Sequence, residues 1–289
     1  MPNPESIPES IPAQQQEPPG RTGGLTPRPR DEMADYQGRD LLADRRALIT
    51  GGDSGIGRAV AVAFAKEGAD VAIAYLCEHD DAEHTAKLVQ NTGRRCLLLP
   101  GDLADRAHCR DVVDRAVQQF GGLDLLVNNV ATQEQESTPE EISDERWLRT
   151  FDVNIHSFFW VTKAALPHLG PGSAIVNTGS VNGLRGNKSL IDYSASKGAV
   201  TAWTYAMAQA LVDRGIRVNC VAPGPVWTPL IPSTMDENKV SSFGAQVPMK
   251  RAAHPDEIAP SYVFFAAEQL SSYYTGEVLA PLGGETLPG

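Results

Sequence analysis

Residues 47–57 read ALITGGDSGIG: a short apolar run, a glycine-rich turn and the start of a segment with helical period. Glycines permit a tight turn and let backbone N–H groups approach a diphosphate, to which the N-terminus of the next helix presents partial positive charge. The spacing differs from G-x-G-x-x-G, and an ordinary strand–helix turn is the alternative. Because the turn joins a strand to an amphipathic helix, we favour a dinucleotide site. The expected contacts are Gly51, Asp53, Ser54, Gly55, Ile56 and Gly57.

Short apolar runs alternate with longer segments of helical period along the rest of the chain, which is typical of repeated β-α-β units. The expected strands are residues 47–50, 71–75, 96–100, 123–128, 174–178, 217–222 and 277–282. The expected helices are residues 56–67, 82–91, 106–120, 145–169, 193–213 and 255–267. This pattern predicts an α/β fold, a doubly wound, mostly parallel seven-stranded Rossmann sheet with helices on both faces. Ligands of such sheets bind beyond the carboxyl ends of the strands.

The first 40 residues differ in composition from the rest. They are rich in Pro, Gln, Glu and Ser and contain one aromatic residue, Tyr36. Such a segment buries too little apolar surface to offset the entropy of ordering it. We therefore expect a flexible tail over residues 1–40, or an arm across a neighbouring subunit. A single dinucleotide-binding domain is expected over residues 41–289.

Composition disfavours several classes of protein. A formal net charge of -11 and a pI near 5.0 argue against nucleic-acid binding, which needs clustered Lys and Arg. The cysteines are far apart and the histidines lack ligand spacing, so we expect reduced thiols and no catalytic metal. No stretch approaches the ~18 apolar residues of a membrane span, and the first residues do not resemble a secretion signal. We expect a cytoplasmic protein without a membrane partner.

Residues after the second and third expected strands bear on the cofactor. At the end of the second strand, an acidic group would accept the 2′-OH of NAD and a basic group would accommodate the phosphate of NADP. Tyr75 stands there, followed by Leu76, so NAD or NADP stays undecided. Arg58 is a candidate for the phosphate and equally an exposed helix residue. Asp102 is either an acceptor for the adenine amine or the N-cap or turn residue of the next helix.

Three motifs, in this order, resemble the short-chain dehydrogenase/reductase family. Residues 50–57 match its T-G-x-x-x-G-x-G turn, residues 128–131 (NNVA) are similar to its N-N-A-G segment, and residues 193–197 (YSASK) match its Y-x-x-x-K motif. The likeness runs from about residue 41 to residue 284. Val130 and Ala131 depart from N-N-A-G, which puts the fine positioning of the cofactor in question. Residues 52–55 and 185–190 are also similar to a bacterial subgroup related to general stress proteins and glucose dehydrogenases.

The resemblance implies a catalytic tetrad of Asn154, Ser180, Tyr193 and Lys197. The expected cofactor contacts outside the glycine-rich turn are Tyr75, Asp102, Leu103, Asn129, Tyr193, Lys197, Pro223, Val226 and Thr228. By the same resemblance Lys197 also holds the nicotinamide ribose, and Asn154 anchors a water that relays protons. Residues 229–248 mix Pro, Ser, Asp and Asn, and we expect them to form a substrate lid.

Tyr193 and Lys197 are four residues apart on an expected helix, so they share one face. A tyrosine with an unperturbed pKa of about 10 is a poor acid–base catalyst at neutral pH, but an opposite charge nearby lowers that pKa by roughly 1 to 3 units. We expect Lys197 to supply the charge and Ser180 to bind the substrate oxygen. Tyr193 then exchanges a proton with that oxygen while a hydride moves to or from the cofactor.

The sequence therefore predicts an NAD(P)-dependent oxidoreductase for a small alcohol or carbonyl compound: an aldehyde, a ketone or a sugar. A non-catalytic dinucleotide-binding regulator is the main alternative. A nucleotide-sugar epimerase is a third, although little chain follows Lys197 for a larger substrate domain. The resemblance also implies a homotetramer or homodimer. Apolar runs at residues 203–207 and 262–267 agree with that, and core burial explains them almost as well.

Overall fold

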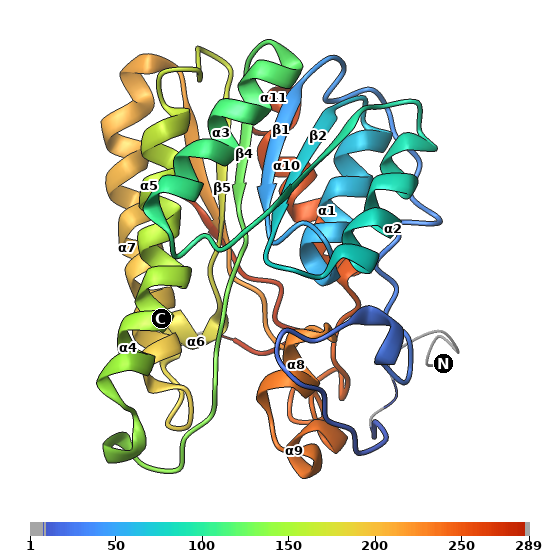
Figure 1. The fold of residues 1–289 in the computed structure, drawn as a ribbon, viewed down its shortest axis with the longest axis vertical. Coiled ribbons are helices and arrows are strands. Elements are labelled where there is room, and N and C mark those ends of the chain that lie inside the picture. The colour runs from blue at the N-terminus through green and yellow to red at the C-terminus, as the bar shows by residue number, and fades with distance from the viewer. Residues whose placement is uncertain (1–7, 9, 287–289) are drawn as a thin grey trace.

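A sheet of seven parallel strands forms the centre of the computed structural model, which describes residues 8 and 10–286 (Figure 1). The strands are β1 (Arg46–Thr50), β2 (Asp70–Tyr75), β3 (Cys96–Pro100), β4 (Leu125–Asn128), β5 (Ala174–Thr178), β6 (Arg217–Val221) and β7 (Val278–Leu279). Their order is β3-β2-β1-β4-β5-β6-β7, and all the pairings are parallel. The predicted doubly wound sheet is confirmed. The order reverses between β1 and β4, where such sheets bind ligands.

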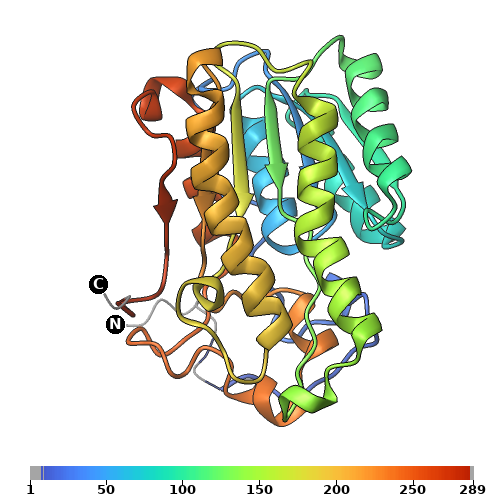
Figure 2. The same cartoon turned by 90° about the vertical axis from the view of Figure 1, so that its left-hand side faces the viewer.

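Helices cover both faces of the sheet, which explains why its strands are mostly apolar. Within β1, Ala47 and Ile49 belong to one core and Leu48 to the other, as the alternation of side chains along a strand requires. The first face is covered by α1 (Gly55–Lys66), α2 (His79–Gln90) and α10 (Pro255–Ala266). The second is covered by α3 (Arg106–Phe120), α5 (Ser157–Ala165) and α7 (Ile191–Leu211), which lie side by side in Figure 2.

The helix expected over residues 145–169 is interrupted. It consists of α4 (Asp144–Phe151), a π-helical turn (Asp152–His156) and α5. The turn contains neither Gly nor Pro, so no local helix breaker explains it. At its centre the buried Asn154 bonds to Thr132 and Ser196, which are distant in sequence. Tertiary contacts therefore accompany the extra residue of the π turn, and such turns are frequent at functional sites.

Short helices occupy the edge of the fold beyond the carboxyl ends of the strands. They are α6 (Val181–Arg185), α8 (Leu230–Thr234) and α9 (Glu237–Ser241), and the last two lie within the expected lid. At the opposite edge, α11 (Glu268–Ser271) follows α10. Short 3-10 turns occur at Thr22–Gly24, Pro139–Glu141 and Val212–Arg214. Across the described part of the chain, no helix has both the length and the apolar character to cross a membrane.

Residues 10–40 differ from the expectation of a flexible tail or an arm on a neighbouring subunit. They run along the body of their own chain, beside α8 and α9 at one end (Figure 1). Ile11, Leu25 and Met33 are buried, with exposed fractions of 1%, 3% and 3%. The segment is polar on average, but its few apolar side chains pack against the body. Average composition therefore hides the residues that anchor it.

Candidate active site

A cavity of about 680 Å³ lies beyond the carboxyl ends of the central strands. Residues that follow β1, β2, β4, β5 and β6 line it, so the parallel sheet itself gathers them. Asp53, Tyr75 and Glu78 border what we call the acidic end. Ser180, Tyr193 and Lys197 border the tyrosine end, and the order of the strands places β1 and β4 between the two.

The glycine-rich turn at the start of α1 leaves room for backbone but not for side chains. Gly51 and Gly55 have φ values of 63° and 53°, in the left-handed region that favours glycine. A Cβ on Gly57 would lie 1.8 Å from the Gly51 carbonyl oxygen. Gly51, Asp53, Ser54, Gly55 and Ile56 line the cavity as expected, whereas Gly57 lies outside the lining and is required for packing. The N-terminus of α1 thus faces a cradle that fits a diphosphate.

Asn129 joins the ends of three strands. Its Nδ2 donates to the carbonyl oxygens of Thr50 (3.1 Å) and Gly51 (2.9 Å), and its Oδ1 accepts from Thr178 Oγ1 at 3.2 Å. Val130 and Ala131, the two departures from N-N-A-G, also line the cavity. The loop after β4 is therefore fixed to the glycine-rich turn by Asn129, whatever the side chains at positions 130 and 131.

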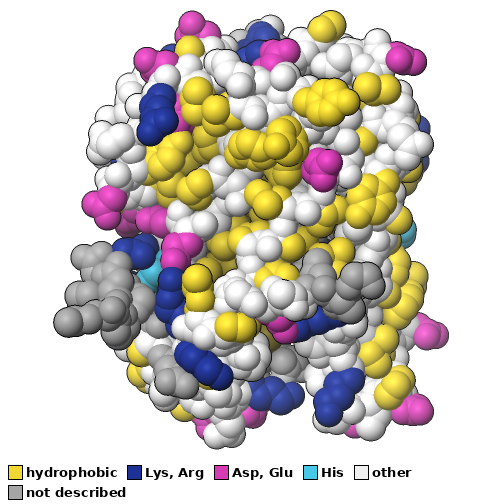
Figure 3. Space-filling view, turned by 180° about the vertical axis from the view of Figure 1, so that it is seen from behind, with side chains coloured by type: hydrophobic (Ala, Val, Ile, Leu, Met, Phe, Trp, Pro, Cys, Tyr) yellow, Lys and Arg dark blue, Asp and Glu magenta, His cyan; other side chains and the backbone are white. Residues whose placement is uncertain are grey.

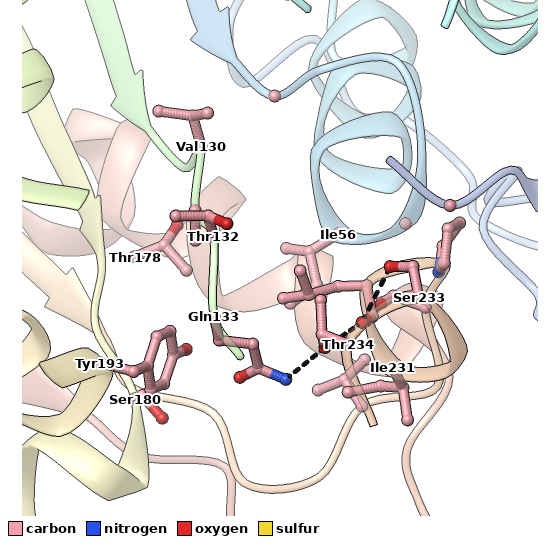
Figure 4. Close-up of a pocket in the computed structure, with 18 of the residues that line it drawn as sticks. Ile56, Val130, Thr132, Gln133, Thr178, Ser180, Tyr193, Ile231, Ser233 and Thr234 are labelled. Atoms are coloured by element: carbon pink, nitrogen blue, oxygen red, sulfur yellow. Dashed lines mark hydrogen bonds between the residues drawn. The ribbon is translucent and has the colours of Figure 1, made fainter. Parts of the chain in front are cut away.

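Tyr193 and Lys197 lie one turn apart on α7, and both are buried. Lys197 Nζ donates to the Thr178 carbonyl oxygen at 2.8 Å and lies 5.8 Å from the centre of the Tyr193 ring. Ser180, at the N-terminus of α6, lies next to the Tyr193 side chain in the cavity lining, as Figure 4 shows. The structure thus brings together three of the four residues of the expected tetrad.

Burial controls the ionisation of this pair. It raises the pKa of Tyr193, and the hydrogen bond with Ser180 offsets only part of that rise. It also lowers the pKa of Lys197 to about 8. The direction for Tyr193 is opposite to the one expected from a neighbouring ammonium group, because both side chains have left water and the ammonium bonds to Thr178. Tyr193 is therefore protonated at neutral pH and placed to donate a proton.

Asn154, the fourth residue of the expected tetrad, lies behind the cavity wall and outside its lining. Its Oδ1 accepts from Thr132 N and its Nδ2 donates to Thr132 O, both at 2.8 Å. Nδ2 also donates to Ser196 Oγ on α7 at 3.0 Å. The side chain is therefore occupied in holding the loop after β4 against α7.

Two carboxylates define the acidic end. Asp53 and Glu78 have exposed fractions of 6% and 9%. Burial raises the pKa of Asp53 to about 7, and the charge of Glu78 adds to the rise. Tyr75 stands between the turn and α2, with its hydroxyl 3.0 Å from His79 Nδ1. This end of the cavity therefore presents hydrogen-bond acceptors where the sequence predicted neither an acid nor a base.

Arg58 is not available to a bound phosphate. The side chain is buried, and its guanidinium pairs with Asp31 (3.1 Å) and Asp81 (2.6 Å). It also donates to the Asp53 carbonyl oxygen at 3.1 and 3.0 Å, so it braces the glycine-rich turn from outside the cavity lining. Its role is structural, and the expectation of a phosphate contact is not supported.

Four further residues expected to contact the cofactor line the cavity: Leu103, Pro223, Val226 and Thr228. Asp102 does so too, but its Oδ1 accepts from Ala104 N at 2.9 Å and its Oδ2 pairs with Arg149 at 2.7 Å. The turn-forming alternative for Asp102 is thus realised in the structure.

The lining also contains residues that were not predicted from the sequence. Glu78 follows the end of β2 by three residues and is an acid near the position where one was sought. Gln133 comes from the loop after β4, and its buried amide gives no signal in sequence. Pro18, Pro19 and Gly20 come from the segment expected to be a tail.

Comparison with known proteins places this geometry among related sequences. A family profile described as enoyl-(acyl carrier protein) reductase matches residues 51–286. The chain is 51% identical to General stress protein 39 of Bacillus subtilis (strain 168), over 96% of this chain and 98% of the relative. It is 48% identical to NADPH-dependent aldehyde reductase 1, chloroplastic, of Arabidopsis thaliana (92% and 94%), and 45% identical to Glucose and ribitol dehydrogenase of Daucus carota (96% and 97%).

A solved structure shares the fold. The crystal structure of a short chain dehydrogenase from Burkholderia cenocepacia J2315 in complex with NADP matches with a TM-score of 0.79 and 33% identity. The match covers 84% of this chain and 98% of the other. The family profile begins at residue 51, so residues 10–40 lie outside it, whereas the match to the B. subtilis relative spans nearly the whole chain.

Proposed function

The chain belongs to the short-chain dehydrogenase/reductase family of NAD(P)-dependent oxidoreductases, and we propose that it reduces the carbonyl group of a small hydroxylated aldehyde or ketone, open-chain sugars included. One observation carries this proposal. A buried, protonated Tyr193 lies beside Ser180 and Lys197 at one end of a cavity whose other walls suit a dinucleotide.

The residues of the tyrosine end divide the work of reduction. When bound, the reduced nicotinamide supplies a hydride to the carbonyl carbon. Tyr193 donates its phenolic proton to the carbonyl oxygen, which completes the alcohol and leaves a phenolate. Ser180 donates a hydrogen bond to the same oxygen and orients it. Lys197, whose pKa of about 8 keeps it charged at pH 7, stabilises the phenolate until a proton returns.

Amide side chains near Tyr193 favour a hydroxylated substrate. The Gln133 amide lies between Tyr193 and Thr234 (Figure 4), and its Nε2 donates to Thr234 Oγ1 at 3.0 Å. Asn182 and Gln246 also line the cavity. Amides both donate and accept hydrogen bonds, so they match hydroxyl groups, and an analogue without the hydroxyls would leave them unpaired. The names of the A. thaliana and D. carota relatives, an aldehyde reductase and a glucose and ribitol dehydrogenase, agree with this class.

At the acidic end the chain favours NAD(H) over NADP(H). Asp53 and Glu78 accept hydrogen bonds from a ribose 2′-OH but repel a phosphate. The basic residues of the described lining are engaged elsewhere: Arg149 with Asp102, Arg185 with Glu285, Lys197 with Thr178 and Lys239 with Gln135. This preference would set the chain apart from its NADPH-dependent A. thaliana relative.

NADP(H) is the alternative, and Arg21 is the residue that favours it. Its charge opposes the rise that burial causes in the pKa of the Cys77 thiol, so it lies near the acidic end although outside the lining. If the chain selects NADP(H), Arg21→Ala lowers NADPH affinity and leaves NADH affinity unchanged. If it selects NAD(H), this substitution changes neither by more than about twofold.

A homodimer or homotetramer also forms part of the proposal. The face that carries α10 and α11 has a broad apolar area (Figure 3), and Leu270, Tyr273 and Leu279 are exposed in or next to α11 and β7. Tyr205 on α7 is 44% exposed. By contrast, Tyr262 and Phe265 are buried, so the apolar run at residues 262–267 belongs to the core. Sedimentation of a monomer at micromolar concentration would contradict the assembly.

A matched substrate panel tests the reaction. NADH and NADPH oxidation would be followed with hydroxyaldehydes, open-chain sugars and deoxy analogues of equal length. We expect kcat/KM to be at least about tenfold higher for the hydroxylated member of each pair, and Gln133→Leu to remove most of that difference. Tight cofactor binding without turnover on any member would favour the regulator instead.

A further inference from the structure

The N-terminal segment contributes to the wall of the cofactor cavity. We call residues 10–33 the strap. Pro18, Pro19 and Gly20 of the strap line the cavity beside α8. The approach is close at Gly20, where an added Cβ would lie 2.3 Å from the Pro229 carbonyl oxygen and 3.1 Å from Ser233 Cβ. At residues 18–20 the strap therefore contacts the lid and also borders the cavity that would hold the ligand.

One set of anchors ties the strap to the elements around the glycine-rich turn. Thr22 N donates to Asp81 Oδ2 on α2 at 3.0 Å. Asp81 and Asp31 both pair with Arg58, the buried arginine that donates to the Asp53 carbonyl oxygen. Buried charges are costly when one partner is lost, so this triad fixes the strap at a defined position. Strap, α2 and glycine-rich turn are thereby joined through one guanidinium group.

A second set of anchors ties the strap to the lid. Gln16 N donates to the Pro232 carbonyl oxygen (2.8 Å) and Ile11 N donates to the Ser241 carbonyl oxygen (3.0 Å). Trp227 Nε1 donates to the Pro27 carbonyl oxygen at 2.7 Å. The strap and the lid also share a separate small core, made of Ile11, Leu25, Trp227, Ile231, Val240 and Ala252. The lid helices α8 and α9 therefore share a core with the strap.

Between these anchors the strap borders the same cavity as the N-terminus of α1. Thr22 bonds to α2, and Gln16 bonds to α8. Residues 18–20, between the two, line the cavity together with Ser54 and Gly55. The N-terminus of α1 is the place where a diphosphate would bind. Residues 18–20 therefore border the cavity that contains the diphosphate cradle.

We propose that the strap is part of the dinucleotide site, where it covers the diphosphate, holds the lid over the nicotinamide half and so slows release of the cofactor. This rests on the proposed function. The strap lies outside the family profile, which begins at residue 51. Cofactor release then requires the strap and lid to separate from the body together.

Two glycines of the strap provide a matched test. Gly20→Ala places a methyl group against the Pro229 carbonyl oxygen and pushes the strap away from α8, whereas Gly23→Ala meets nothing within 4 Å. The readout is the dissociation rate of bound NADH and NADPH, measured by stopped-flow displacement. We expect about a tenfold faster dissociation in Gly20→Ala and less than a twofold change in Gly23→Ala. Equal dissociation rates in both variants and the parent would overturn the proposal.

A second pair separates loss of the strap's hold from a direct effect on the cavity. Ile11→Ser breaks the core shared with the lid from outside the cavity, and Met33→Ser removes an equally buried side chain that packs against the main body. We expect both to lower Tm, but only Ile11→Ser to speed cofactor dissociation. Faster cofactor release in both variants, or in neither, would contradict the proposed role of the strap. Absence of dinucleotide binding in the parent protein would instead overturn the proposed function, and the strap's role with it.

Discussion

The tyrosine end and the acidic end of the cavity both bury ionisable side chains, but they hold them differently. At the tyrosine end, Lys197 has a fixed acceptor in the Thr178 carbonyl oxygen at 2.8 Å, and Tyr193 has Ser180. At the acidic end, Asp53 and Glu78 repel each other. Both ends have hydrogen bonds before a ligand arrives, since Glu78 Oε2 accepts from Cys77 N at 2.8 Å. The two ends differ in charge: the acidic end holds two like charges close together, which a ligand that donates hydrogen bonds would stabilise, whereas the ammonium group of the tyrosine end already has its acceptor.

Removing the charge at the tyrosine end should have the largest effect. Lys197→Met keeps the length of the side chain but withdraws the ammonium group that stabilises the Tyr193 phenolate. We expect kcat for carbonyl reduction to fall about 10²- to 10⁴-fold, measured with saturating cofactor. Turnover within about fivefold of the parent would show that this end does not depend on the charge of Lys197.

Removing one charge at the acidic end should alter cofactor choice and leave the chemical step intact. Asp53→Asn loses an anionic acceptor for the ribose 2′-OH and a source of repulsion toward a phosphate. A hydrogen bond to a charged group contributes about 1.5–3 kcal/mol. We therefore expect the ratio of NADH affinity to NADPH affinity to drop about 10- to 100-fold.

Glu83→Gln is the matched control for Asp53→Asn. Glu83 is exposed on α2 and contributes to the rise in the pKa of Tyr75, but it lies outside the cavity lining. Titration calorimetry of both variants distinguishes contact from long-range charge. An equal shift in the two would mean that Asp53 does not contact the ribose.

The affinity for NADH should depend on pH through Asp53. The pKa of this carboxyl is about 7 in the free protein, so binding to the ribose hydroxyl must draw it toward the ionised form. NADH affinity should therefore rise about threefold to tenfold between pH 6 and pH 8, and Asp53→Asn should flatten the profile. A parent profile as flat as that of the variant would remove Asp53 from recognition.

The same carboxyl should cost stability when no cofactor is bound. Its folded pKa lies above the unfolded value of about 3.9, so its contribution to stability is full below about pH 4 and is lost as pH rises through about 7. At pH 8, cofactor-free Asp53→Asn should melt about 2 to 4 °C above the parent, and the gap should shrink toward pH 5. If calorimetry found the parent more stable than Asp53→Asn at pH 8, it would contradict the expected destabilising effect of the ionised Asp53.

Most of the sheet follows from local patterns in the sequence. Apolar runs bounded by turns located both ends of β3 and of β5, and β5 is buried along its whole length, as expected of a strand covered on both faces. The π turn at Asn154 was not predicted, because the partners of its side chain, Thr132 and Ser196, come from other elements. The strap was missed since its apolar anchors, such as Ile11 and Leu25, are separated by polar and proline-rich chain.

The site divides in the same way. Spacing on one helix was enough to place Tyr193 beside Lys197, and the glycine-rich turn located the diphosphate cradle. The raised pKa of Tyr193 could not be predicted, because it depends on burial that only the packed structure provides. Glu78 and Gln133 reach the cavity through the path of loops, which residue patterns do not determine.

The central claim is that Tyr193 donates the proton at the tyrosine end, and a single turnover with bound cofactor tests it most directly. The parent protein and Tyr193→Phe would each be loaded with reduced cofactor, checked for equal occupancy by fluorescence, and mixed with a reducible hydroxyaldehyde. The account predicts rapid oxidation of the bound cofactor in the parent and a rate at least about 10²-fold lower in the variant. Equal rates in the two, at equal occupancy, would contradict it.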